Sequence, residues 1–415
     1  MCRASSTSMI NAFPSGPTSC AQHSRRTFRD GFRSVISVCP PALGGRCGPP
    51  TAFAAGVVDR SCVAEEHGGR AGRREETDTM PGMVAAGFFR AIQLALFPLA
   101  VAAYIATVPR MLAYSRRTGV SATLFASLYT RCMQHRLQTR PDDPAARLLA
   151  VMPNVSREGL RLETAPTLVG HLLTGYVPRI YRYPYRGPAP MRHQSTARTT
   201  YYDAALQRHL AGVDQLVILG AGFDTRVFRL PPGNRMRCFE IDTPRTQAYK
   251  IAMLKKAGLP THLATYVSAD FETEDWMEKL VTAGFDPGRP AFFIWEAVTM
   301  YLDRASVEAT LRRIAGTAPG SAVAFDYFST EILASGSPYM RYARAATNYV
   351  GEPLSFGIDN TPPARKSASD FVGSFGLILE EHRNFGRETR WRSAPAGFVT
   401  AVVPAGSGHS RQEEG

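Results

Sequence analysis

Gln215-Leu-Val-Ile-Leu-Gly-Ala-Gly-Phe-Asp-Thr-Arg226 is a short apolar run that ends in a turn with two glycines. A brief, β-branched apolar run is typical of a strand that is buried on both faces of a parallel sheet. Gly220 and Gly222 allow the backbone to turn tightly and leave room for a ligand against the chain. The segment therefore predicts the first strand of an α/β fold, with a ligand-binding turn at its carboxyl end.

The chain beyond Gln194 alternates between strand and helix patterns. Strands are expected at Met236–Asp242, Thr265–Ser268, Ala291–Trp295 and Ser321–Asp326, with a closing pair at Leu377–Glu380 and Gly397–Val403. Helices are expected between them at Thr243–Ala257, Trp276–Ala283 and Ser306–Ala315. Alternation of this kind predicts a doubly wound, mostly parallel sheet.

The composition of the 415 residues excludes several classes of protein. Hydrophobic residues make up 44% and charged residues 20% of the chain, which rules out a wholly disordered, collagen-like or coiled-coil protein. The net charge of +13 is spread along the chain, so we expect no nucleic acid as a partner. Five of the seven cysteines lie in the first 62 residues, and neither Cys-x-x-Cys nor His-x-x-x-His occurs. We therefore expect no metal site and an intracellular main domain.

The two ends of the chain have the composition of extensions. Residues 1–82 are rich in Ser, Arg, Gly and Pro, and up to Val58 they hold six arginines against one acid, Asp30. That bias is typical of an organelle transit peptide; the plainer interpretation is an unstructured extension, or translation that starts at Met80 or Met83. Residues 405–415 are expected to be a disordered tail.

Residues 91–109 are the most apolar stretch and carry no charge. Their length matches the hydrocarbon core of a bilayer, in which Pro98 is tolerated. Within 83–117 we therefore expect a membrane-anchor helix, with Arg116 and Arg117 on the cytosolic side and the catalytic domain facing the cytosol. The alternative is a helix that packs on the domain of a soluble cytoplasmic or organellar protein. Residues 118–195 are expected to be a helical lead-in and cap.

Acidic residues follow the first two predicted strands. Asp224, in the glycine turn, would repel a phosphate and suits a ligand with positive charge, such as S-adenosylmethionine; a helix N-cap is the other role open to it. Glu240 and Asp242 end the second strand, where a doubly wound fold places a carboxylate on ribose hydroxyls. Asp242 is the better candidate, because a structural salt bridge is an equal role for Glu240.

Further polar residues extend the same predicted crevice. Asp270 and Phe271 follow the third strand and could accept from and stack on an adenine ring. Glu296 follows the fourth strand, where it would favour a sulfonium or amino group. Arg198 could pair bidentately with a ligand carboxylate. This ordered set at successive strand ends predicts a cofactor site.

The chain resembles the leucine carboxyl methyltransferase-like family of S-adenosylmethionine-dependent methyltransferases over roughly Thr196–Val403. The resemblance lies in the motifs Ala197–Asp203, Ile218–Arg226, Phe239–Pro244, Ser268–Phe271 and Ile294–Leu302. It implies the class I methyltransferase fold, which is Rossmann-like, over residues 196–404, behind an N-terminal helical extension. It also implies cofactor contacts from Arg198, Gly220, Asp242, Asp270, Phe271 and Glu296. Phe271 departs from the Asp-Leu that the family often has there.

The expected activity is methyl transfer to an oxygen acceptor, such as a carboxylate of a small molecule or of a protein C-terminus. A carboxylate needs no general base, whereas a phenol or alcohol usually does. His382 and Tyr301 are the only candidates for such a group, and Tyr301 would more naturally orient a ligand. Residues 335–365 are expected to cap the acceptor site. Two alternatives remain: a catalytically silent, membrane-tethered binding protein of the same fold, and an NAD-linked oxidoreductase.

Overall fold

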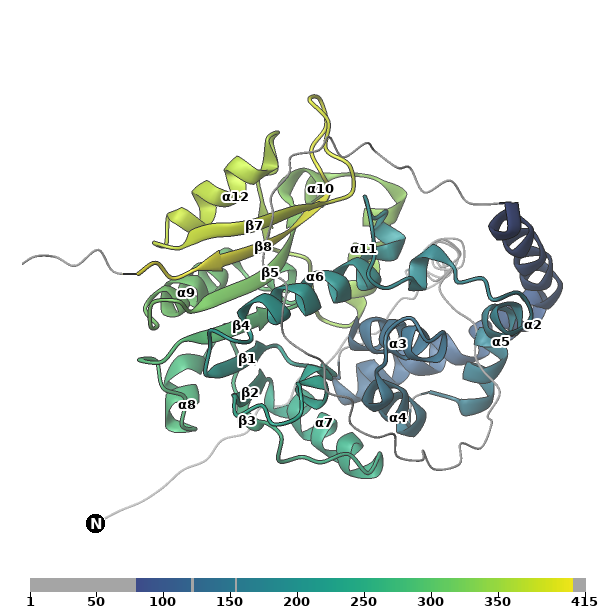
Figure 1. Ribbon diagram of the computed structural model, residues 1–415, viewed down its shortest axis with the longest axis horizontal. Coiled ribbons are helices and arrows are strands. Elements are labelled where there is room, and N and C mark those ends of the chain that lie inside the picture. The colour runs from purple at the N-terminus through teal and green to yellow at the C-terminus, as the bar shows by residue number, and fades with distance from the viewer. Residues whose placement is uncertain (1–79, 121–122, 154, 406–415) are drawn as a thin grey trace, which may run out of the picture.

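The computed structural model describes residues 80–120, 123–153 and 155–405 (Figure 1). One sheet has the strand order β3-β2-β1-β4-β5-β8-β7, and β6 pairs with β5 beside this path. The pairs among β1 to β5 are parallel, while β8 is antiparallel to both β5 and β7. The strands are β1 Gln215–Leu219, β2 Arg237–Asp242, β3 Thr265–Ser268, β4 Ala291–Trp295, β5 Ala322–Ser329, β6 Gly357–Ile358, β7 Ile378–Phe385 and β8 Ala396–Val402. The prediction of a doubly wound, mostly parallel sheet is confirmed.

Helices pack around the sheet, and the helices nearest the N-terminus lie to one side of it (Figure 1). They are α2 Met80–Thr118, α3 Thr123–Arg136, α4 Asp143–Val151, α5 Arg157–Thr174, α6 Gln194–His209, α7 Pro244–Lys256, α8 Trp276–Thr282, α9 Arg304–Ala315, α10 Thr330–Ala334, α11 Pro338–Tyr349 and α12 Ala364–Gly373. The helices predicted after β2, β3 and β4 are therefore present, within two residues of their expected ends. α6, α11 and α12 were not expected.

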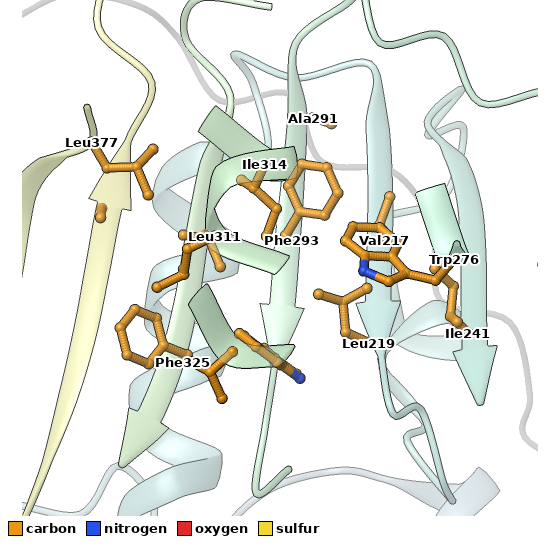
Figure 2. Close-up of a cluster of buried hydrophobic side chains, with 14 of the residues drawn as sticks. Val217, Leu219, Ile241, Trp276, Ala291, Phe293, Leu311, Ile314, Phe325 and Leu377 are labelled. Atoms are coloured by element: carbon orange, nitrogen blue, oxygen red, sulfur yellow. The ribbon is translucent and has the colours of Figure 1, made fainter. Parts of the chain in front are cut away.

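The central strands are buried because both of their faces are covered. Val217 and Leu219 of β1 point into one apolar cluster, which α8, α9 and α12 complete (Figure 2). The alternate residues Leu216 and Ile218 point into a second cluster beneath α6. This two-sided burial is the reason that β1 reads as a continuous apolar run.

A third apolar cluster joins the lead-in helices to the domain. Phe125 and Leu128 of α3 and Leu148 of α4 pack with Leu254 of α7 and with Phe223 of the glycine turn. Residues 118–195 hold α3, α4 and α5, followed by a mostly non-helical stretch at 175–190, and α3 lies against the turn that follows β1.

The predicted anchor segment 91–109 lies inside a longer helix, α2, which includes both Pro98 and Pro109. Among the described residues, Gly82–Thr118 is the one helix long and apolar enough to cross a membrane, and 12% of its most apolar window is buried. The helix begins at Met80, within the segment predicted to be an extension. The predictions for residues 1–79 and 406–415 lie outside the described residues.

Candidate cofactor site

The turn after β1 depends on glycine at two positions. Gly220 has φ +62° and Gly222 has φ +42°, in the left-handed region that other residues rarely adopt. A Cβ atom at Gly220 would overlap the side chain of Val298, and one at Gly222 would overlap Leu124 of α3. Both the conformation and the close approach of neighbouring side chains therefore require glycine.

Asp242 lies beside this turn at the end of β2. Its Oδ2 accepts a hydrogen bond of 2.7 Å from the Gly222 N–H, and its Oδ1 accepts one of 2.7 Å from the Thr243 N–H. Burial raises the pKa of Asp242 above its ordinary value, although the two backbone donors oppose the rise. Each carboxylate oxygen can accept more than one hydrogen bond, so both remain able to accept from a ribose hydroxyl.

Glu296 follows β4 and is held by two buried arginines. Its Oε2 accepts from Arg131 Nη2 at 2.8 Å and from Arg226 Nη1 at 2.5 Å. Its Oε1 is buried and has no hydrogen-bond partner among the described residues. Arg131 Nε and Arg226 Nη2 are likewise buried without a hydrogen-bond partner among the described residues. Buried polar atoms are nearly always paired, so this group has unused capacity for a polar ligand.

Asp224 belongs to the same ion cluster. Its Oδ2 accepts from Arg131 Nη2 at 3.2 Å and from Arg226 Nη1, and its Oδ1 accepts from the Arg226 N–H at 2.7 Å. Burial opposes ionisation, but Arg226 and Arg131 outweigh it and hold the pKa of Asp224 well below its ordinary value. Both oxygens thus accept hydrogen bonds inside the protein, and the bond to the Arg226 N–H is a local turn contact. The N-cap of the short 3-10 turn at Arg226–Arg229 is Thr225, so Asp224 is not the cap.

The ion cluster continues away from the glycine turn. Asp203 of α6 receives Arg226 Nε at 2.9 Å, Arg140 Nε at 2.7 Å and Arg229 Nη1 at 3.2 Å. Arg140 in turn pairs with Asp142, the N-cap of α4. The cluster therefore ties α3, α4 and α6 to the turn after β1.

Glu240 has an internal partner on α7. Lys250 Nζ lies 2.6 Å from Glu240 Oε2, and both side chains are at most 2% exposed. Burial raises the pKa of Glu240 to about 7, while Lys250 acts in the opposite direction. The structure thus gives this carboxylate the salt bridge that was the alternative role for it.

Arg198 is also engaged within the protein. Its Nε and Nη2 lie 2.9 and 2.8 Å from Asp326 Oδ2 on β5. Asp326 Oδ1 accepts from the Tyr202 hydroxyl at 2.8 Å and from the Ala297 N–H at 2.7 Å. The Arg198 guanidinium is consequently fixed beside the loop that carries Glu296.

Asp270, Phe271 and Tyr301 occupy the loops after β3 and β4. Asp270 Oδ1 accepts from the Glu272 N–H at 2.9 Å. The Phe271 ring packs against Trp276 and Trp295, with centroid distances of 6.0 and 6.4 Å. Tyr301 is half-buried against the cluster beneath α6.

His382 lies on β7, away from the loops after β1 to β4. Its Nε2 lies 3.0 Å from the Tyr327 hydroxyl, and burial lowers its pKa to about 4. It is neutral at physiological pH, and its hydrogen bond and ring contact with Tyr327 lie outside the crevice.

The predicted residues thus fall into two groups. Gly220, Gly222, Asp242, Asp270 and Glu296 lie at the carboxyl ends of the parallel strands β1 to β4, where open α/β sheets bind ligands. The second group, Asp224 and Glu240, lies in the glycine turn and within β2, and its carboxylates, like that of Glu296, pair with basic side chains of the protein. Sequence reasoning missed Arg131, Arg226 and Asp326; of these, Arg226 stood in the decisive segment, six residues after Gly220.

Comparison with known proteins gives one family. The leucine carboxyl methyltransferase family matches residues 182–315. A protein of Streptomyces coelicolor, named "Putative S-adenosyl-L-methionine-dependent methyltransferase", is 33% identical over 211 residues, which cover 49% of this chain and 73% of that protein. A protein of Mycolicibacterium vanbaalenii with the same description is 35% identical over 170 residues. In that second case the match spans 40% of this chain and 54%, about half, of the relative.

Solved structures resemble this chain only distantly. A DUF574 family protein from Streptomyces avermitilis aligns with a TM-score of 0.39 and 14% identity, over 63% of this chain and 97% of that one. A likeness of this degree is too low to support a conclusion. The sequence relatives and the arrangement of the crevice agree with one another. The chain belongs to the leucine carboxyl methyltransferase-like family of S-adenosyl-L-methionine-dependent methyltransferases.

Proposed function

We propose that this protein transfers a methyl group from S-adenosylmethionine to an oxygen acceptor, a carboxylate of a small molecule or of a protein C-terminus. The observation that carries the proposal is the group at the carboxyl ends of β1, β2 and β4. There, a glycine turn that admits no side chain adjoins Asp242 and a buried Glu296 oxygen without a partner. Residues 196–404 form the methyltransferase domain in this proposal, and 118–195 form its lead-in and cap.

S-adenosylmethionine supplies an activated methyl group on a sulfonium, with no phosphate. The residues present fit such a ligand, because the carboxylates of Asp242 and Glu296 favour positive charge and would repel phosphates. Asp242 would accept the ribose hydroxyls, and Gly220 would let the ligand approach the backbone. Asp270 and Phe271 would contact the adenine from the loop after β3. A carboxylate at the position of Asp242 would also bind the ribose of a dinucleotide, so titration with NAD is the test that separates an NAD-linked oxidoreductase from this proposal.

Arg198 would bind the carboxylate end of the cofactor. Its pairing with Asp326 fixes the guanidinium in place and leaves donors on Nη1 and Nη2 for a second carboxylate. Glu296 would contact the cofactor close to Arg198, because the next residue, Ala297, donates its N–H to the same Asp326 that pairs with Arg198.

A carboxylate acceptor accords with the side chains around the crevice. It is already a nucleophile at neutral pH, so the protein has only to hold it in line with the methyl group. Tyr301 is proposed as a positioning residue. Specificity is assigned to residues 335–365, which include α11 and follow β5, the strand whose Asp326 pairs with Arg198.

Membrane association is the second part of the proposal. It is supported by the exposed apolar side chains along the segment 91–109 of α2, and it places the catalytic domain at the cytosolic side of a membrane. Fractionation of cells that express the full chain tests it. We expect the protein in the membrane fraction, and recovery wholly in the soluble fraction would contradict this part.

Calorimetric titration of the purified chain tests the cofactor. Saturable binding of S-adenosylmethionine and of its demethylated product is expected, with no binding of NAD. Absence of binding by a folded protein would instead favour the catalytically silent binding protein. Transfer of a labelled methyl group then tests the acceptor class, because carboxyl methyl esters release methanol in base whereas phenol ethers do not.

A further inference from the structure

The outer side of α2 is apolar over most of its length. Phe88 is 63%, Leu94 74%, Phe97 60% and Ile105 66% exposed. Met83, Val84, Leu99 and Val101 are exposed along the same helix, and α5 adds exposed Leu162, Leu172 and Leu173. So large an apolar surface on a folded chain marks a site of interaction. We call these exposed residues of the two helices the α2–α5 apolar face.

The inner side of α2 is docked against α5 in antiparallel fashion. The Phe89 ring lies against Gly170, where a Cβ atom would come within 2.7 Å of Phe89 Cδ2. Further along, Gln93 Nε2 donates to Thr167 Oγ1 at 3.3 Å, and Thr107 Oγ1 donates to Glu163 Oε2 at 3.5 Å. α2 is therefore packed on the protein from Phe89 to Thr107, and only its outer side is available.

The charges beside this face select the partner. α2 contains four arginines, Arg90, Arg110, Arg116 and Arg117, and no acidic residue. Basic residues beside an apolar surface favour the anionic lipids of a bilayer. A second copy of the chain would bring the same four positive charges against its own, which disfavours a dimer on this face.

The neighbouring helix determines how α2 can meet a bilayer. The exposed charges Arg157, Glu158 and Arg161 lie on α5 in the half that packs beside Thr107. If α2 crossed the bilayer while docked, these charges would enter the hydrocarbon, which is costly. Crossing alone would require α2 to leave α5 and lose the contacts of Phe89, Gln93 and Thr107.

We propose that the α2–α5 apolar face is a membrane-binding surface that lies in the plane of an anionic bilayer, and that α2 does not cross it. The exposed apolar side chains of both helices enter the lipid, the arginines contact the headgroups, and α2 stays packed against α5. This inference rests on the proposed membrane association and is independent of methyl transfer.

Flotation of the purified full chain with lipid vesicles tests the surface. The wild type is expected to float with phosphatidylcholine vesicles that contain phosphatidylglycerol. A Phe88→Asp/Phe97→Asp variant should lose at least tenfold in bound fraction, since each ring contributes roughly a tenfold gain on burial. Ile378→Asp, at an exposed apolar residue outside the α2–α5 apolar face, should bind as the wild type does. Its strand, β7, lies apart from α2 in Figure 1. Equal loss in both variants, or no flotation of the wild type, would overturn the proposal.

Two further measurements separate the rival occupants. Arg110→Gln/Arg117→Gln should weaken binding to the anionic vesicles only; equal binding by this variant would overturn the role of charge. Sedimentation without lipid should show a monomer, and a dimer that Phe97→Asp dissociates would assign the face to a second copy. Unfolding temperatures close to that of the wild type show that the variants are folded.

The topology is tested with an Asn-x-Ser glycosylation site placed upstream of Met80 in the full chain, translated with microsomes. An in-plane helix leaves this site outside the lumen and unmodified. Glycosylation would show that α2 spans the membrane, which overturns the in-plane mode while the proposed membrane association stands. Failure of both flotation and microsome binding would instead contradict the association itself.

Discussion

Replacement of Asp242 by Asn gives the sharpest test of the cofactor site. Asp242 accepts from the Gly222 and Thr243 N–H groups at 2.7 Å each, and Asn can accept with only one of its two terminal atoms. The variant therefore loses one hydrogen bond to a charged acceptor, together with the charge itself. Such a bond contributes about 1.5–3 kcal/mol. The loss falls on the turn that must hold the cofactor, so the Kd for S-adenosylmethionine should rise roughly tenfold to hundredfold.

The assay is calorimetric titration of S-adenosylmethionine, with thermal unfolding measured alongside. Asp214→Asn is the matched control, because Asp214 lies next to the amino end of β1 and pairs with Arg289 at 3.1 Å on the exposed side of the sheet. The control should lose little stability, since exposed ion pairs contribute about 0–1 kcal/mol, and it should keep its affinity. Unchanged affinity in a folded Asp242→Asn protein would refute the reasoning and move the ribose contact elsewhere.

Three other perturbations follow from the same contacts. Gly220→Ala should destabilise the fold by about 1–3 kcal/mol in urea unfolding and abolish cofactor binding, because φ is +62° and Val298 occupies the space that the added Cβ would need. Gly233→Ala is the control for the backbone conformation alone, since Gly233 lies in an exposed turn with φ +79° and open space around its Cβ position. Arg131→Leu leaves Asp224 and Glu296 to Arg226 alone and should cost about 3–5 kcal/mol of unfolding free energy, and a loss below 1 kcal/mol would contradict the buried ion cluster. The pKa of Glu240 in the folded protein is about 7, above the ordinary value of 4.5, so the folded protein keeps a proton that the unfolded chain loses. The contribution of this group to stability therefore declines as pH rises from about 4.5 to 7. Glu240→Gln should remove that decline in unfolding free energy, and identical pH slopes in both proteins would contradict the argument.

The sequence was informative where burial alone determines local structure. The strands at 215–219, 265–268 and 291–295 were predicted to the residue, because each is a short apolar or β-branched run ended by Gly, Pro or a polar residue. α6 was missed, since its Thr- and Tyr-rich sequence has no clear apolar stripe. The apolar segment at 91–109 was recognised in the sequence, but its packing on α5 depends on Gly159 and Gly170, which carry no pattern of their own.

The position of the polar residues at the strand ends was predictable, but their pairing was not. Asp242, Asp270 and Glu296 lie at one edge of the sheet as expected, because parallel strands present their carboxyl ends there. The buried ion pairs around these residues join side chains that are far apart along the chain. Arg131 precedes Asp224 by 93 residues, and Arg198 precedes Asp326 by 128, so no local spacing reveals either pair.

The bond between Arg131 and Glu296 has a consequence for the order of folding. The two residues are 165 positions apart, so α3 leaves the ribosome long before its partner is synthesised. During that interval the Arg131 guanidinium and the apolar side of α3 have no sheet to pack on, which leaves them exposed to chaperones and to misassembly. The pair between Arg131 and Glu296 can form only after β4 has been synthesised. Formation of the ion cluster is therefore a long-range step that joins the lead-in helices to the completed sheet.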